Sequence, residues 1–185
     1  MINDTEYVCG GKEPITAQCF NLITGKNAPI SLLHKRVFAS SVTTNVTNFV
    51  FGGTDGSGAL ATYETISVDH AQSEGVLPFT WQKGCSTLIN STTILLAGGI
   101  QNETENNKGR TGNTWFFNLR TKESTQGPTM IQDRYWFGCG YISGINSVAV
   151  FGGGQPPMAT TEIVKLPGGS FKKGIHQRLF DYERF

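Results

Sequence analysis

Four cysteines are the residues of this chain best suited to covalent chemistry, at Cys9, Cys19, Cys85 and Cys139. No two of them have the C-x-x-C spacing of a zinc site. Cys9 and Cys19 flank one expected hairpin, so they could form a disulfide, which would require an oxidising compartment. Cys85 and Cys139 each stand thirteen residues before a Gly-Gly doublet. We therefore expect them at equivalent positions of neighbouring sheets, too far apart to bridge, each as a small buried apolar residue.

The histidines and serines do not predict a catalytic or metal site. His34, His70 and His176 occupy unrelated places in the chain, whereas a metal centre usually needs three or more converging ligands. Ser40 and Ser41 have no histidine and aspartate arranged to activate them. We expect no enzymatic activity, no metal and no cofactor.

Composition excludes several other classes. Fifteen Lys and Arg residues against fourteen Asp and Glu residues give a net charge of +1, which argues against nucleic acid as a partner. The longest apolar run is about five residues, far below the roughly 20 that a spanning helix needs, so we expect no membrane insertion. The 23 glycines, the 33 serines and threonines and the aromatic residues favour an all-β fold with many tight turns.

A short apolar segment followed by two glycines occurs four times. The doublets are Gly10-Gly11, Gly52-Gly53, Gly98-Gly99 and Gly152-Gly153, at spacings of 42, 46 and 54 residues. Each is followed by a polar loop, a second apolar segment, a turn and a further strand. The connections are too short for parallel crossovers, so we expect units of four antiparallel strands. Such units bury both faces only by stacking, and radial stacking gives a propeller.

The repeated residues resemble the Kelch repeat. Three of the doublets match its glycines, Arg36 and Arg134 match its arginine before the inner strand, and Phe20, Tyr63 and Trp115 match its third-strand aromatic residue. The segment Gln126–Met130 followed by Arg134 is especially typical. The fourth-strand tryptophan is missing in most units, and the third inner strand begins near Trp81 rather than an arginine.

The resemblance implies an all-β fold, a Kelch-type β-propeller segment of about four antiparallel four-stranded blades over residues 1–170. Residues 171–185 are expected to form a tail outside the pattern. At about 47 residues per unit the chain holds just under four blades, whereas the family usually closes its ring with about six. We therefore expect an incomplete ring, a fragment of a longer protein. A half ring completed by self-association through open blade faces, or an open four-blade form, are the alternatives.

The expected function is non-catalytic binding of a protein partner through the second-to-third strand loops and the loops between blades. Arginine forks bind carboxylates in two-pronged fashion, so the candidate binding residues are Arg36, Arg110 and Arg134 with Tyr135 and Trp136. The alternative for Arg36 and Arg134 is that they brace neighbouring blades. Glu64 and Glu162 occupy related places on third strands. We expect them to be exposed or paired within the repeat rather than to form an acid/base dyad.

Four Asn-x-Ser/Thr sequons predict possible glycosylation, at Asn3, Asn45, Asn90 and Asn102. Asn45 and Asn90 fall on the same turn between the first and second strands of their units. The sequence leaves the compartment open, with an extracellular location slightly favoured over a cytoplasmic one. A secreted glycan- or matrix-binding module is therefore the alternative function, and an inactive galactose-oxidase-like remnant is the more remote one.

Overall fold

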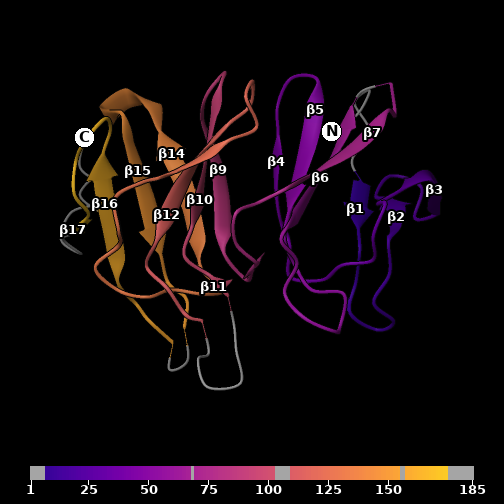
Figure 1. Cartoon of the computed structure of the whole chain (residues 1–185), viewed down its shortest axis with the longest axis horizontal. Helices are drawn as coiled ribbons and strands as arrows, with labels where there is room; N and C mark the ends of the chain where they lie inside the picture. The colour runs from indigo at the N-terminus through magenta and orange to yellow at the C-terminus, as the bar shows by residue number, and fades with distance from the viewer. Residues whose placement is uncertain (1–6, 68, 103–108, 155–156, 175–185) are drawn as a thin grey trace, which may run out of the picture.

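The computed structural model describes residues 7–67, 69–102, 109–154 and 157–174. Those residues form β-strands and one short 3₁₀ turn at Ser143–Ile145, arranged as a row of antiparallel sheets (Figure 1). The prediction of an all-β fold is confirmed.

Each sheet is a meander whose strands lie in chain order. The first sheet contains β1 (Tyr7–Cys9), β2 (Gln18–Asn21) and β3 (Asn27–Ser31). The second contains β4 (Ser40–Thr43), β5 (Thr47–Phe51), β6 (Thr62–Ser67) and β7 (Gln72–Val76). The third contains β9 (Cys85–Asn90), β10 (Thr93–Ala97), β12 (Thr114–Asn118) and β13 (Ser124–Gln126).

The fourth sheet contains β14 (Gly138–Ile142), β15 (Ser147–Phe151), β16 (Thr161–Lys165) and β17 (Lys172–Lys173). A two-stranded pair joins β8 (Trp81–Gln82), which precedes the third sheet in the chain, to β11 (Ile100–Gln101), which lies between β10 and β12. Because β17 pairs with β16, the fourth sheet continues past residue 170, where we expected the repeat to end. Residues 175–185 of the expected tail lie outside the described residues.

The third sheet is covered on both faces, which explains the unbroken apolar run of β10. Ile94 and Leu96 pack against aromatic side chains of the second sheet, whereas Leu95 and Ala97 pack against valines of the fourth. A third apolar cluster joins the first sheet to the second. The four sheets therefore stack face to face in one row, with a core between each neighbouring pair.

The first strands of the sheets meet along one edge of this row. β9 contacts both β4 and β14, and the Oγ atoms of Ser40 and Ser86 lie 2.7 Å apart across β4 and β9. In the described part of the chain, no strand pairing joins the first sheet to the fourth to close a ring.

The first three glycine doublets connect their sheet to the segment that leads into the next. All eight glycines have a positive φ, from 55° to 157°. The N–H of Gly53 donates to the carbonyl oxygen of Trp81 at 2.7 Å. A Cβ atom on Gly52 would overlap that same carbonyl. A doublet therefore lets the second strand turn while the following segment passes directly against it.

Candidate functional site

Arg36 lies buried where the chain passes from the first sheet to the second, and it pairs with Glu64 of β6. Its Nη2 donates to Oε1 of Glu64, and its Nη1 donates to the carbonyl oxygen of Gly52 at 2.6 Å. Glu64 also accepts from the backbone N–H groups of Leu33 at 2.6 Å and His34 at 3.0 Å. The pair therefore fastens the connecting segment to the third strand of the second sheet.

Arg134 makes the same set of contacts in the fourth sheet. Its Nη2 donates to Glu162 at 3.0 Å and its Nη1 donates to the carbonyl oxygen of Gly152 at 2.7 Å. Glu162 accepts from the backbone N–H groups of Ile131 at 2.6 Å and Gln132 at 3.1 Å. In both sheets the glutamate stands 31, 30 and 28 residues after its three partners. The repeat thus conserves a whole buried network.

These contacts correct part of the predicted binding site. Arg36 and Arg134 are 1% and 0% exposed, and their guanidinium groups are already bonded to carboxylates and carbonyl oxygens of the chain. Neither can offer a free fork to a partner's carboxylate, because removing it from its glutamate would leave a buried charge unpaired. The two arginines brace the sheets, and Glu64 and Glu162 are buried partners rather than exposed strand residues.

Trp81 occupies in the third unit the position that Arg134 occupies in the fourth. Its carbonyl oxygen accepts from the N–H of Gly53 at 2.7 Å, just as that of Arg134 accepts from Gly99 at 2.6 Å. The indole Nε1 of Trp81 then donates to the carbonyl oxygen of Gly98 at 2.8 Å. The apparent departure from the repeat therefore preserves its central hydrogen bond.

The third-strand residue that faces this buried position also differs in the third unit. Trp115 stands opposite Leu96, two residues before the doublet, in the place that Glu64 takes in the second sheet. The ring of Phe79, two residues before Trp81, lies 4.7 Å from the ring of Trp115. The third unit thus uses aromatic packing where its neighbours use an ion pair.

Two residues after this buried position, three units place a residue with left-handed backbone. Phe38, Lys83 and Trp136 have φ values of 61°, 57° and 53°. The N–H of Lys83 donates to the carbonyl oxygen of Phe38 at 2.9 Å, and that of Trp136 donates to Lys83 at 2.8 Å. Bulky residues rarely adopt such a φ, at a cost of about 1–3 kcal/mol each. Hydrogen bonds between successive units hold all three in this state.

The side chains of these residues gather into one group. Lys83 Nζ lies 5.0 Å from the ring centroid of Phe38 and 4.9 Å from that of Trp136. The Tyr135 ring lies 5.3 Å from the Trp136 ring, and Arg110 Cζ lies 4.7 Å from the Tyr135 ring centroid. We call these five residues the aromatic–cation cluster. Trp136 is 50% exposed and Arg110 is exposed, whereas Tyr135, predicted as a binding residue, is buried at 5%. Trp136 and Arg110 therefore face solvent, and Tyr135 supports them from beneath.

Three of the five predicted binding residues therefore lie together, namely Arg110, Tyr135 and Trp136. The segment between β11 and β12 brings Arg110 to this place, since the carbonyl oxygen of Thr111 accepts from the N–H of Arg134 at 3.4 Å. Sequence reasoning missed Phe38 and Lys83. The signal that could have found them is their position in the repeat: Phe38 stands two residues after Arg36, and Lys83 stands two residues after Trp81.

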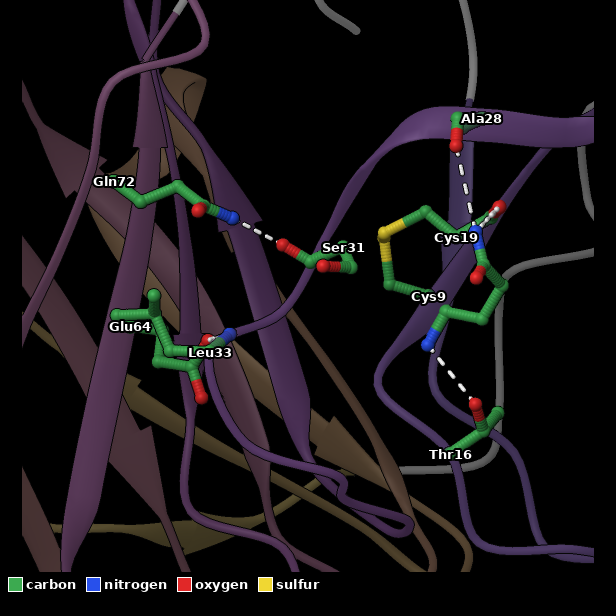
Figure 2. The surroundings of a disulfide bond; sticks show 9 residues. Cys9, Thr16, Cys19, Ala28, Ser31, Leu33, Glu64 and Gln72 are labelled. Atoms are coloured by element: carbon green, nitrogen blue, oxygen red, sulfur yellow. Dashed lines mark hydrogen bonds between the residues drawn. A yellow bond between two sulfur atoms is a disulfide. The ribbon is translucent and has the colours of Figure 1, made fainter.

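The first disulfide lies within the first sheet. Cys9 and Cys19 stand opposite each other on β1 and β2 and are bonded (Figure 2). The same view shows Gln72 of β7, whose side-chain amide donates to the carbonyl oxygen of Ser31. The bond thus crosses the first sheet beside a polar contact that joins this sheet to the second.

The second disulfide overturns the expectation that Cys85 and Cys139 stand too far apart. They are bonded, with their Cα atoms 5.9 Å apart. The reason is that β9 and β14 run side by side at the edge where the first strands meet, so equivalent positions on these two strands are close. All four cysteines of the chain are used, and none is free.

The described ranges contain no group of three or more His, Cys, Asp or Glu side chains placed to hold a metal ion. They also contain no helix long and apolar enough to cross a membrane. No protein-family model matches the chain, and no curated protein matches it.

Proposed function

We propose that the chain is a segment of a Kelch-type β-propeller that binds a protein partner, without catalysis, through the aromatic–cation cluster. The repeated doublets, the buried arginines and the stack of four antiparallel sheets support the fold part of the proposal. The observation that carries the binding part is Trp136, a half-exposed indole on left-handed backbone that lies between Lys83 and Tyr135.

The cluster has the composition of a binding hot spot. Tryptophan, tyrosine and arginine dominate the binding energy of protein interfaces, and left-handed backbone at bulky residues is concentrated at functional sites. Its residues come from three neighbouring units that hydrogen bonds tie together, so it is preorganised. A rigid scaffold that presents such residues on connecting segments is a usual arrangement for recognition.

The charge of the cluster favours an acidic partner segment. Lys83 and Arg110 supply two cations, each of which already lies near the face of an aromatic ring. A carboxylate can approach these cations from solvent while an apolar side chain packs on the exposed indole of Trp136. We expect the partner to present Asp or Glu next to an apolar or aromatic residue.

A peptide library displayed on phage tests this proposal whatever the identity of the natural partner. Peptides selected on the full chain should be enriched in Asp and Glu beside an apolar residue. Trp136→Ala and Arg110→Ala should each weaken the selected peptides at least about tenfold, or about 1.4 kcal/mol. Arg120→Ala is the matched control, because Arg120 is also exposed but follows β12 at the opposite end of that strand. It should leave the affinity unchanged.

Two results would overturn the proposal. One is selected peptides that bind the Trp136→Ala variant as tightly as the original chain. The other is a chain that binds acidic glycans but selects no peptide whose binding depends on the cluster, when the glycan binding is lost in the Arg110→Ala variant. That second result would favour the alternative, a secreted module that binds glycans or matrix.

A further inference from the structure

The tips of two equivalent hairpins carry an Asn-x-Thr sequon. Asn45-Val46-Thr47 runs from the turn between β4 and β5 into the first residue of β5, and Asn90-Ser91-Thr92 runs from the last residue of β9 into the turn before β10. Both sequons therefore lie at first-to-second strand turns, in neighbouring sheets. Sequons occur in any chain rich in Asn, Ser and Thr, so their accessibility decides whether they can be used.

The turn around Asn45 is closed without its side chain. Thr44 makes the turn: its Oγ1 donates to the carbonyl oxygen of Thr47 at 2.8 Å and accepts from the N–H of Thr47 at 3.0 Å. Asn45 is exposed, and within the described residues its amide makes no hydrogen bond. Its Nδ2 is therefore free to be substituted without loss of a contact.

Asn90 uses only one end of its amide. Its Oδ1 accepts from the N–H of Thr92 and from the Thr92 hydroxyl, both at 2.9 Å. Among the described residues its Nδ2 makes no hydrogen bond. Asn90, Ser91 and Thr92 are all exposed, so the whole sequon is open to an enzyme.

The corresponding turn of the fourth sheet contains an asparagine that uses both ends of its amide. Asn146 accepts from the Tyr141 hydroxyl at 2.7 Å, and its Nδ2 donates to the carbonyl oxygen of Leu166 at 2.7 Å. Val148 follows two residues later, so Asn146 is not part of a sequon. At these three equivalent turns, Asn45 and Asn90 thus leave their Nδ2 unused, whereas Asn146 does not. Asn21 and Asn118, which are outside sequons and lie at other turns, also use only Oδ1, so the free Nδ2 shows accessibility and the sequon supplies the specificity.

Both turns lie away from the aromatic–cation cluster. β4 begins two residues after Phe38 and ends two residues before Asn45, so the strand separates the cluster from the turn. In Figure 1 the turn between β4 and β5 lies at the upper edge, whereas β11, which follows the third doublet, lies near the lower ends of the neighbouring strands. Asn45 and Asn90 line one cavity of about 670 Å³ at the upper edge. A glycan on either asparagine would leave the cluster uncovered.

The cysteines give an independent indication of the compartment. All four are consumed by Cys9–Cys19 and Cys85–Cys139. Disulfides persist in oxidising compartments and are rare in the cytosol. The endoplasmic reticulum lumen is such a compartment, and N-glycosylation marks a secreted chain. The disulfides and the free Nδ2 atoms are therefore both consistent with passage through the secretory pathway.

We propose that this chain matures in the secretory pathway and carries N-linked glycans on Asn45 and Asn90. In each transfer the Nδ2 atom attacks C1 of an oligosaccharide held on a polyprenyl pyrophosphate donor. The N–C1 bond forms, the C1–O bond to the pyrophosphate breaks, Nδ2 loses one proton, and the polyprenyl pyrophosphate leaves. The proposal does not use the other two sequons. Asn3 lies outside the described residues, and so does Thr104, the threonine of the Asn102 sequon.

The test is a peptide map of the protein isolated from its natural source. Peptide-N-glycosidase treatment in ¹⁸O-water should convert Asn45 and Asn90 to ¹⁸O-labelled Asp. Alkylation before reduction should label none of the four cysteines, and alkylation after reduction should label all of them. Unmodified Asn45 and Asn90 in the natural protein overturn the glycan assignment, and cysteines alkylated without reduction overturn the assigned compartment.

Matched variants expressed from the full reading frame separate the sequon from the fold. Thr47→Ala should remove one glycan and Thr92→Ala the other, each seen as a single loss of mass that enzymatic deglycosylation abolishes. Thr47→Ser and Thr92→Ser keep the acceptor sequence and should keep both glycans. Since the Thr47 side chain makes no contact that closes the turn, an unchanged mass in Thr47→Ala contradicts the assignment of Asn45 without doubt about folding. None of these results depends on the peptide-binding experiment.

Discussion

The indole nitrogen of Trp81 donates a 2.8 Å hydrogen bond to the carbonyl oxygen of Gly98. At the same place in the fourth sheet, a guanidinium nitrogen of Arg134 donates to Gly152 at 2.7 Å. Two side chains that share neither charge nor shape thus close the same junction. What the junction requires is a buried donor that reaches the first glycine of the doublet, and the rest of the side chain must then suit its neighbour on the third strand.

This relationship predicts the effect of exchanging the donor alone. Trp81→Arg should destabilise the chain by about 3–5 kcal/mol, because the new guanidinium would be buried opposite Trp115 rather than a carboxylate. The double variant Trp81→Arg with Trp115→Glu rebuilds the pair of the neighbouring sheets and should recover part of that loss. Urea unfolding measures both. A single variant as stable as the original chain would show that the third unit does not depend on its aromatic partner.

The Arg134–Glu162 pair predicts a coupling between two buried charges. Arg134→Met and Glu162→Gln should each destabilise by about 3–5 kcal/mol, because the first leaves a carboxylate unpaired and the second a guanidinium. The double variant should lose much less than the sum of the two changes. Urea unfolding of the four proteins gives the coupling free energy. Arg120→Met is the control, since Arg120 is exposed and its change should stay within about 0.5 kcal/mol. Strictly additive losses would contradict the pairing.

The repeat of short strands could be predicted from sequence because its signals are local. A doublet such as Gly52-Gly53 requires positive φ at both glycines, and the apolar segment before it has the length of a strand. The prediction of antiparallel sheets therefore depended on neighbouring residues and on short connections. It did not require knowledge of how the sheets pack on each other.

The binding site was only partly predictable because burial is not local. Arg36 and Trp136 both lie in segments that lead into a first strand, four residues before β4 and two residues before β14. Arg36 is nevertheless 1% exposed and Trp136 is 50% exposed. The difference comes from Glu64, which lies 28 residues after Arg36 and meets it only in the folded sheet. The Cys85–Cys139 bond was missed for a similar reason, since its closeness arises from the meeting of two first strands.

The two disulfides predict different losses of stability. Cys9–Cys19 closes a loop of 10 residues and Cys85–Cys139 a loop of 54. Loop-closure entropy assigns them about 3 and about 4 kcal/mol. The paired variants Cys9→Ser/Cys19→Ser and Cys85→Ser/Cys139→Ser should follow this order in urea unfolding. The second pair should lose more, because its bond also joins two sheets. A larger loss from the first pair would contradict this role for the second bond.

The outer faces of the first and fourth sheets carry exposed apolar side chains. In the fourth sheet the Phe151 ring lies over Gly138 and is 51% exposed, and Ile142 is 43% exposed. In the first sheet Val8 stands opposite Phe20, and these two are 50% and 41% exposed. Each outer face thus carries apolar side chains of the kind that pack between neighbouring sheets in this fold.

Self-association through these faces stays a prediction, and it has a direct measurement. If a second copy covers the face of the fourth sheet, the average mass in sedimentation equilibrium should rise with protein concentration, since apolar area is removed from water. Phe151→Ser should shift that rise to higher concentration. Val76→Ser is the control, because Val76 is 74% exposed on the outer strand β7 rather than on either open face. A mass that stays monomeric at every concentration, or equal shifts in both variants, would remove the open faces as the cause of assembly.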